Sequence, residues 1–234
     1  MTDIITVTVN PALDVSASTA QVRPTSKLRC DQVERHPGGG GVNVARVLHR
    51  LGADCEALCL VGGPTGQMLL QLLALEGVHC LPVPIGGHTR ESFTVRELAS
   101  GQEYRFVLPG PQVLESEVAA TLDTLGQQSV PRYLVASGSL PPGMPAHFYA
   151  QLAGVARAWG ARLVVDGSGP AMAAALEHGV YMVKPSLREM RELTGQPLTS
   201  LHSVREAARQ WVVDGHAEVV AVSLGDKGAV LVSA

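Results

Sequence analysis

The sequence predicts an α/β protein whose central, mostly parallel sheet is covered by helices. The first observation is that helical and strand patterns alternate regularly, with short connections, from residue 115 onward. This alternation is typical of parallel sheets, because each helix carries the chain back to the edge where the next strand begins. The second observation is that glycines follow the helical patterns where helices are expected to end, at Gly160, Gly179, Gly195 and Gly215.

Length and composition allow one large domain, or one domain with a small appendage. The 234 residues are 46% hydrophobic and 17% charged, which is an ordinary globular balance. The net charge of -3 disfavours a nucleic-acid surface, so a small ligand is the better expectation. The cysteines show no C-x-x-C spacing, which disfavours zinc. With no basic signal sequence and no long apolar segment, we expect a cytoplasmic protein with reduced thiols.

The N-terminal part is expected to begin the sheet. Ile and Val alternate with Thr over residues 4–9, which predicts a strand that ends at Asn10-Pro11. The apolar residues from Val44 to Leu51 have the i, i+3, i+4, i+7 spacing of a helix. Further strands are predicted at 55–61 and 78–84, with a helix at 65–76 between them.

Two segments differ from the rest in their residue pattern and predict a small separate sheet. Residues 92–98 and 103–108 are β-rich runs around a glycine-bearing turn, which is the pattern of a hairpin. Residues 15–33 alternate in polarity without a helical period, and 27–33 could be an exposed strand. We therefore assign 15–33 and 89–108 to a small β lid. The α/β body then comprises residues 1–14, 34–88 and 109–234.

The second half is expected to complete the body. Pro145 suits the first turn of a helix. Residues 228–233 have a strand pattern with no helix after them, so we expect the sheet to be incomplete in this chain or completed by further sequence. Helices are predicted at 115–125, 145–159, 170–177, 187–193 and 204–213, and strands at 132–136, 162–165, 181–183 and 219–223.

A run of glycines, Gly38 to Gly41, precedes the helix that starts near Asn43. It matches neither the P-loop pattern G-x-x-x-x-G-K-[ST] nor the dinucleotide pattern G-x-G-x-x-G. A flexible linker is the alternative, but a linker would continue into polar low-complexity sequence rather than a helix. Free backbone N–H groups at a helix start, together with the Asn43 amide, suit a polyhydroxylated ligand.

Ligands of open parallel sheets bind beyond the carboxyl ends of the strands, so the polar residues there are site candidates. Several of them lie in a series of motifs: Asp14, Gly38–Asn43, Gly138–Gly143, Val165-Asp166, Lys184-Pro185, Glu189, and Ser223–Gly225 with Gly228. These motifs occur in the order found in the ribokinase-like sugar kinases, so the chain resembles the phosphofructokinase-B (PfkB) carbohydrate kinase family over its whole length. Within that family, Lys27–Cys30 and Tyr104–Gly110 are most similar to the minor-isozyme 6-phosphofructokinases.

The resemblance implies a ribokinase-like three-layer sandwich with a small β lid that often serves as a homodimer interface. It also implies transfer of the γ-phosphoryl group of ATP, with Mg²⁺, to a sugar phosphate. Fructose 6-phosphate, giving fructose 1,6-bisphosphate in glycolysis, is the expected substrate. Fructose 1-phosphate and tagatose 6-phosphate are alternatives, because their kinases share Gly138–Gly143. An adenosine or ribose kinase is disfavoured by the arginines of the lid, since a neutral sugar needs no phosphate clamp.

For the sugar ring, the resemblance implies that Asp14 and Asn43 bind hydroxyl groups. The backbone of Gly38, Gly39 and Gly40 would lie beside the ring. A carboxylate can accept two hydroxyl hydrogen bonds, and glycine permits a close approach. For Asp14, an Asx turn after Pro11 is the alternative reading.

A sugar that already carries phosphate calls for cations, preferably a planar guanidinium. Arg90, just before the hairpin, is the leading candidate, and Lys27 and Arg105 in the lid follow. A solvated surface charge is the alternative for each. Ser139 could reach the same phosphate or cap the next helix.

For the nucleotide, the resemblance places Lys184, Ser223, Gly225 and Gly228 around ATP. Glu189 falls in the family's Asn-x-x-Glu motif, which organises Mg²⁺ through waters. Here the motif reads Ser186-Leu187-Arg188-Glu189, so Ser186 is expected at the nucleotide without the two donors of an asparagine amide.

The family's Gly-Ala-Gly-Asp motif, which supplies the catalytic base and a backbone anion hole, does not occur before Ala234. We therefore expect no catalytic base in residues 1–234 and no kinase activity from this chain by itself. Asp14 and Asp166 remain open as substitutes. The alternative from another class is a binding-only protein that holds sugar phosphate or nucleotide without turnover.

Overall fold

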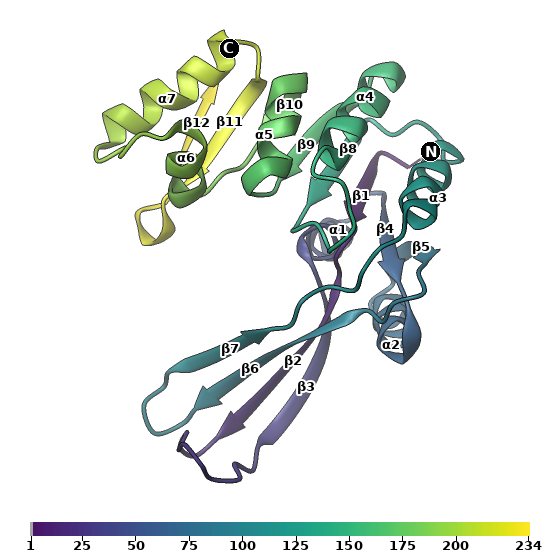
Figure 1. The fold of residues 1–234 in the computed structure, drawn as a ribbon, viewed down its shortest axis with the longest axis vertical. Coiled ribbons are helices and arrows are strands. Elements are labelled where there is room, and N and C mark those ends of the chain that lie inside the picture. Colours follow the sequence, from purple (N-terminus) through teal and green to yellow (C-terminus); the bar gives the residue numbers. More distant parts are fainter. Residues whose placement is uncertain (1) are drawn as a thin grey trace.

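The computed structural model describes residues 2–234 and contains two β-sheets, one in the body and one in a projecting arm (Figure 1). The large sheet has eight strands in the order β12-β11-β10-β9-β8-β1-β4-β5. Its neighbouring strands are parallel except for the antiparallel pair β11 and β12 at one edge. The strands are β1 (Ile4–Thr8), β4 (Cys55–Val61), β5 (His79–Pro84), β8 (Tyr133–Ser137), β9 (Arg162–Asp166), β10 (Val180–Val183), β11 (Ala217–Ser223) and β12 (Ala229–Ser233).

Helices cover both faces of the large sheet, as the two sides of β4 demonstrate. Ala57 and Cys59 point into a core cluster that contains residues of the first two helices. Leu58 and Leu60 point the other way, into the larger cluster that contains residues of the later helices. The predicted α/β fold with helices on both faces is therefore confirmed. The helices are α1 (Gly40–Arg50), α2 (Gly63–Leu75), α3 (Glu115–Gly126), α4 (Phe148–Trp159), α5 (Gly169–His178), α6 (Leu187–Thr194) and α7 (Leu201–Val213), with a 3₁₀ turn η1 (Gly225–Lys227).

The smaller sheet extends away from the body as a long arm (Figure 1). Its strand order is β3-β2-β6-β7, with β2 antiparallel to β3, parallel to β6, and β6 antiparallel to β7. Only Val9, Asn10 and Pro11 separate the end of β1 from the start of β2, so this short link joins the two sheets. The strands are β2 (Ala12–Thr19), β3 (Asp31–Gly38), β6 (Arg90–Glu97) and β7 (Glu103–Val107).

The first two strands of the small sheet are where the sequence prediction was wrong in detail. No strand was predicted over β2, and an exposed strand was expected at 27–33, whereas β3 runs from Asp31 to Gly38. Residues 31–36 of β3 are exposed, so the strand lacks the buried face that produces a recognisable alternation. The predicted hairpin is present as β6 and β7.

The small sheet has one polar and one apolar face, because directly paired residues share a face. Val15 pairs with Phe93, and Phe93 pairs with Phe106, which together form an apolar row across three strands. Asp14 pairs with Ser92 on the opposite, polar face. Phe106 is 57% exposed, so the apolar face is not covered by this chain.

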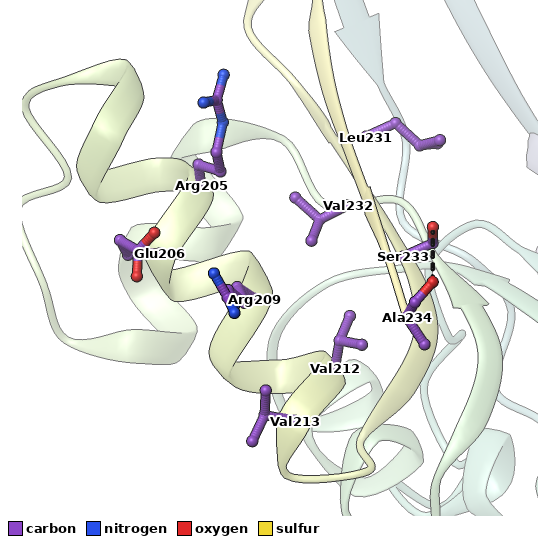
Figure 2. A pocket seen from close by; sticks show the side chains of 9 residues that line it. All are labelled: Arg205, Glu206, Arg209, Val212, Val213, Leu231, Val232, Ser233 and Ala234. Atoms are coloured by element: carbon purple, nitrogen blue, oxygen red, sulfur yellow. Dashed lines mark hydrogen bonds between the residues drawn. The ribbon is translucent and has the colours of Figure 1, made fainter.

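A hollow between α7 and β12 lies at the edge of the large sheet, with Val212 and Val232 on its two sides (Figure 2). Ser233, which also lines it, pairs with Val219 near the start of β11, whereas Ser223 is at the other end of that strand. The hollow therefore lies away from the carboxyl ends of the parallel strands. No helix within residues 2–234 combines the length and the apolar character needed to span a lipid bilayer.

Candidate active site at the junction of the two sheets

Asp14 and the glycine run meet where the small sheet joins the body. In the β2–β3 ladder, Ala12 is opposite Gly38 and Asp14 is opposite His36. A Cβ atom at Gly38 would collide with the Asp14 carboxylate, so a larger residue there would displace that side chain. The carboxylate is half-buried and lies directly beside the start of α1.

The rest of the glycine run packs against the ends of β1 and β8. Gly39 caps α1 with φ +114°, a conformation that favours glycine, and Gly40 lies against the Ser137 side chain and the Gly138 backbone. Gly41 lies against Thr8 and Val7. Gly38 and Gly41 are buried, whereas Gly39 and Gly40 are half-buried. Contacts within the protein thus explain all four glycines, and only the middle two keep partly accessible backbone.

Asn43 lies on the first turn of α1 with an exposed side chain that Arg46 orients. Arg46 Nη1 donates to Asn43 Oδ1 at 3.3 Å and to the Pro37 carbonyl at 2.9 Å. The same guanidinium forms two hydrogen bonds, at 2.6 and 2.8 Å, with the carboxylate of Glu76 that follows α2. These bonds lower the pKa of Glu76. Arg46 therefore fastens the glycine turn and Asn43 to the second helix.

Arg90 begins β6 beside Ala12 and is held by backbone carbonyls. Its Nε and Nη2 donate to the Asn10 carbonyl at 3.4 Å each, and its Nη1 donates to the Leu108 carbonyl at 3.3 Å. Burial lowers the pKa of Arg90, and the negative charge of Asp14 acts in the opposite direction. Arg90 forms no ion pair with any carboxylate of residues 2–234. A half-buried guanidinium with no carboxylate in direct contact suits an anionic ligand.

Ser139 completes this group from the turn that follows β8. Its Oγ accepts a hydrogen bond from Asn10 Nδ2 at 3.0 Å. The next helix, α4, is capped by His147, so the alternative that Ser139 caps it is wrong. The structure therefore brings Asp14, Gly38, Gly39, Gly40, Asn43, Arg90 and Ser139 to one junction, which we call the sugar end after the role that the sequence predicts for it.

Lys27 and Arg105 are not part of the sugar end. Lys27 is exposed in the connection between β2 and β3, which lies at the tip of the arm (Figure 1). Arg105 is exposed on β7 and pairs with Thr94, four residues beyond Arg90 on β6. Within one chain, these two cations do not join the residues around Arg90.

Lys184 lies farther along the same edge, beyond the ends of β9 and β10. Its Nζ is 3.0 Å from Asp166 Oδ1, and Ser137 Oγ donates to Asp166 Oδ2 at 3.2 Å. Asp166 thus connects Lys184 to Ser137, whose side chain lies against Gly40. The ion pair is half-exposed, so water can screen it and a competing anion could approach the ammonium.

Ser186 and Glu189 form a capping box at the start of α6. Glu189 Oε2 accepts hydrogen bonds from both the backbone N–H and the hydroxyl of Ser186, at 2.8 Å each. Ser186 Oγ accepts from the Glu189 N–H at 3.3 Å. This arrangement satisfies backbone donors that a helix start leaves unpaired, so it explains both residues without a ligand.

Ser223, Gly225 and Gly228 surround a tight turn after β11. Leu224 N–H donates to the Gly228 carbonyl at 2.8 Å, and the two glycines have φ values of +66° and +88°. These left-handed conformations account for glycine at both positions. A cavity beside the turn was not predicted from the sequence, because its apolar residues come from separate elements. It is lined mainly by Leu187, Leu198, Leu201, Leu224, Asp226 and Lys227. We call this region, with Lys184, the nucleotide end after the role that the sequence predicts for it.

A model of the pfkB family of carbohydrate kinases matches residues 6–234. The chain belongs to this family. As a PfkB family member, it is 46% identical over 232 residues to the ATP-dependent 6-phosphofructokinase isozyme 2 of Mycobacterium tuberculosis (strain CDC 1551 / Oshkosh). The match covers 97% of this chain and 67% of that relative.

Solved structures agree with this assignment. The phosphofructokinase-2 from Escherichia coli in complex with fructose-6-phosphate matches with a TM-score of 0.95 and 41% identity, over 100% of this chain and 78% of that one. The tetrameric inhibited form of the same Escherichia coli protein matches with a TM-score of 0.94 and 42% identity, over 100% and 77% of the two chains. The ribokinase-like fold of PfkB proteins is thereby confirmed for this chain.

Asn10 is the residue of this PfkB family chain whose place in the site was least visible in the sequence. It was noted only as one of the polar residues at the carboxyl ends of the strands, where ligands are expected, and the structure shows that it contacts both Arg90 and Ser139. The signal that could have singled it out is the Asn-Pro pair between two strand patterns, which marks a sharp change of direction.

Proposed function

We propose that this PfkB family chain provides the sugar-phosphate and ATP sites of an ATP-dependent 6-phosphofructokinase. The observation that carries the proposal is the half-buried Arg90, which has no carboxylate partner among residues 2–234 and lies beside Asp14. A neutral sugar would leave that guanidinium uncompensated, whereas a phosphorylated one would pair with it. The names of the relatives support fructose 6-phosphate as the sugar and ATP as the donor.

At the sugar end, each group has a role that its chemistry allows. The Asp14 carboxylate accepts hydrogen bonds from sugar hydroxyls, and the Asn43 amide can donate and accept. The partly accessible backbone of Gly39 and Gly40 offers N–H groups at the start of α1, where the helix dipole favours negative charge. Phosphoryl transfer depends mainly on such positioning and on electrostatic stabilisation.

At the nucleotide end, we propose that ATP binds beside the turn that contains Gly225 and Gly228. The cavity there is lined by four leucines and Val204 together with polar and charged residues, and its apolar part suits an adenine ring. Lys184 lies between this turn and the sugar end and could pair with the phosphates in place of Asp166. We propose that Ser186 and Ser223 contact the nucleotide. Both are already held in position, because Ser186 caps α6 and forms a β-bridge with Ser223 at the end of β11.

The donor set for Mg²⁺ is small. Residues 2–234 contain no group of three or more His, Cys, Asp or Glu side chains that could hold a metal ion. Glu189 commits Oε2 to the capping box, and its Oε1 lies 4.0 Å from Arg188. Mg²⁺ keeps several waters when one or two carboxylates and substrate phosphates hold it, so Glu189 fits a water-mediated role. When bound, the ion would neutralise charge on the phosphates of ATP.

We further propose that two copies pair through the apolar face of the small sheet. Val15, Phe93 and Phe106 form an uncovered apolar row on that face, which is costly for a lone chain in water. Pairing would also allow Lys27 at the tip of one arm to approach the other copy. Sedimentation velocity of Phe93→Glu, with Thr94→Glu on the polar face as the control, tests this proposal. Only the first variant is expected to shift the protein to monomers, and equal behaviour contradicts the pairing.

We also propose a cytoplasmic location, in keeping with four cysteines that are all free thiols.

The substrate is tested by calorimetric titration with fructose 6-phosphate, fructose 1-phosphate, tagatose 6-phosphate and fructose, together with a coupled assay for ADP. Tightest binding of fructose 6-phosphate supports the proposal, and tightest binding of either other phosphate selects the corresponding kinase. Binding without ADP formation supports the binding-only alternative for this chain. No binding of any phosphorylated hexose refutes a sugar-phosphate site.

A further inference from the structure

Asn10 lies in the link between the two sheets and touches both proposed phosphate ligands. Its side-chain Nδ2 donates to Ser139 Oγ at 3.0 Å. Its backbone carbonyl accepts from Arg90 Nε and Nη2, each at 3.4 Å. Asn10 is only 8% exposed, so it does not itself present a surface to a ligand. One buried residue thus connects a group from the turn after β8 with a group from the lid.

We propose that Asn10 is a positioning residue that sets the separation and orientation of Arg90 and Ser139 for the phosphate of the sugar. The inference rests on the proposed function. Arg90 is on β6 of the small sheet and Ser139 is in the turn after β8 of the large sheet, and within residues 2–234 Asn10 is the residue that forms hydrogen bonds with both. A guanidinium and a hydroxyl can act on the same phosphate only if their separation is held constant.

The hydrogen-bond direction supports this role. A serine hydroxyl has one proton to donate and two lone pairs to accept with. Because Asn10 Nδ2 donates to Ser139 Oγ, it occupies a lone pair and leaves the hydroxyl proton available. Ser139 is exposed, so this proton can be donated to a phosphate oxygen. Asn10 therefore determines both the position of the Ser139 side chain and its availability as a hydrogen-bond donor.

The other end of the Asn10 side chain argues against a role in stability alone. Asn10 Oδ1 is buried and has no hydrogen-bond partner within residues 2–234. It lies so close to Gly110 that a Cβ atom there would collide with it. A buried acceptor without a partner destabilises the folded chain. The unpaired Oδ1 lowers the stability of the folded chain, whereas Nδ2 of the same amide forms the hydrogen bond with Ser139. A role in holding Ser139 therefore explains the side chain better than a role in stability.

The loop after β7 holds this arrangement from the lid side. The Leu108 carbonyl accepts a hydrogen bond from Arg90 Nη1, and Gly110 lies against the Asn10 amide. Arg90 and Asn10 are thus enclosed by the same loop. A change in the lid that moved this loop would reach Arg90 directly through the Leu108 carbonyl and Ser139 through Asn10.

The test is the affinity of the 1–234 chain for fructose 6-phosphate, measured by calorimetry on wild type, Asn10→Ala, Ser139→Ala and the double variant. We expect Asn10→Ala to raise Kd about tenfold, in the range of one lost hydrogen bond to a charged site. In the Ser139→Ala background the same change should alter Kd by less than about twofold, because the partner is already absent. Thr121→Ala, which removes a buried hydroxyl far from the site, is the control for general destabilisation.

Two results would overturn the inference while the proposed function stands. One is wild-type affinity for fructose 6-phosphate in Asn10→Ala. The other is an equal loss in both backgrounds, which would mean that Asn10 does not act through Ser139. If wild type itself does not bind fructose 6-phosphate, the proposed function fails and the inference fails with it.

A second variant keeps the inference testable if Asn10→Ala does not fold. Asn10→Asp has the same shape, but its carboxylate would accept the Ser139 proton and add a negative charge beside Arg90. We expect it to weaken fructose 6-phosphate binding by more than tenfold and to change fructose binding much less, as measured by NMR titration. Equal weakening of both sugars would indicate general damage to the pocket and would contradict the positioning role.

Discussion

The body and the small sheet differ in how their side chains are covered, and the candidate site lies where they meet. In the body, Leu58 is fully buried between the sheet and its helices. In the small sheet, residues 31–36 of β3 are exposed and Phe106 is 57% exposed. The body can therefore be stable through its own packing, whereas the arm has no core of its own. Asp14 and Arg90 lie at the root of the arm, where the body holds them.

The largest expected effect is the difference in stability between two matched truncations. Leu58→Ala should lower the free energy of unfolding by about 2–5 kcal/mol, because a cavity forms in a closely packed core. Phe106→Ala, in the uncovered face of the arm, should lower it by about 1 kcal/mol or less. Urea denaturation followed by circular dichroism, at a concentration where the chain is monomeric, measures both. Similar losses would mean that the arm contributes to the folding core as much as the body does.

The next effect distinguishes the root of the arm from its tip. Arg90→Ala should weaken fructose 6-phosphate binding about 10–100-fold, which is the range for losing hydrogen bonds to a charged ligand. Arg96→Ala is the matched control, since Arg96 is an exposed arginine on the same strand and the same face, six residues farther out. It should change the affinity by less than about twofold. Calorimetry with fructose 6-phosphate and with ATP measures both variants, and an equal loss for the two ligands would contradict a phosphate role for Arg90.

A smaller effect is expected from hydroxyl groups in the two regions. Ser186→Ala removes the N-cap of α6 in the body and should cost about 1 kcal/mol of stability. Ser16→Ala, on β2 in the arm, should cost less than about 0.5 kcal/mol because its hydroxyl makes no hydrogen bond within residues 2–234. Thermal unfolding compares the two. If Ser186→Ala also weakens ATP binding strongly while stability is kept, the serine contacts the nucleotide rather than only the helix.

The smallest effect is a pH dependence of the Glu76–Arg46 contact in the body. The hydrogen bond from Arg46 lowers the pKa of Glu76 in the folded chain below its unfolded value of about 4.3. The contribution to stability is therefore present above about pH 4.3 and is lost as the pH falls through the lowered pKa. Glu76→Gln should reduce stability by at most about 1 kcal/mol at pH 7, and the difference from wild type should shrink as the pH falls through the lowered pKa. A difference that did not shrink on acidification would show that the charge is not responsible.

Much of the body could be predicted from the sequence because its elements are recorded in local patterns. Residues 55–61 form the expected strand, and the predicted helix at 187–193 agrees closely with α6, whose capping residues lie at both ends. Both faces of β4 are buried, so its sequence is a short continuous apolar run, whereas α6 packs one face inward, so its apolar residues recur with the helical period. The start of the small sheet could not be predicted in the same way, since β3 has no buried face over residues 31–36.

The candidate site was predictable in its members but not in their contacts. Asp14, Asn43 and Ser139 were identified from motifs and Arg90 from its place just before the predicted hairpin, and the structure brings them together. The sequence did not reveal that Asn10 joins Arg90 to Ser139, or that Ser186 and Glu189 bond to each other. Nor did the sequence reveal that, within one chain, Lys27 and Arg105 lie apart from the sugar end. These are long-range distances, and residue spacing along the chain does not specify them.

The sequence by itself determined the order of the elements, the parallel body and the residue types available for sugar and nucleotide. Hydrophobic periodicity and glycine positions are sufficient for that, because they act over one or two turns of chain. Only the tertiary structure decided which glycines are covered by Asp14, Thr8 and Ser137, and which cation lacks a counterion. Those properties depend on the packing of segments that lie far apart in the chain, where burial and electrostatic environment are set by neighbours in space.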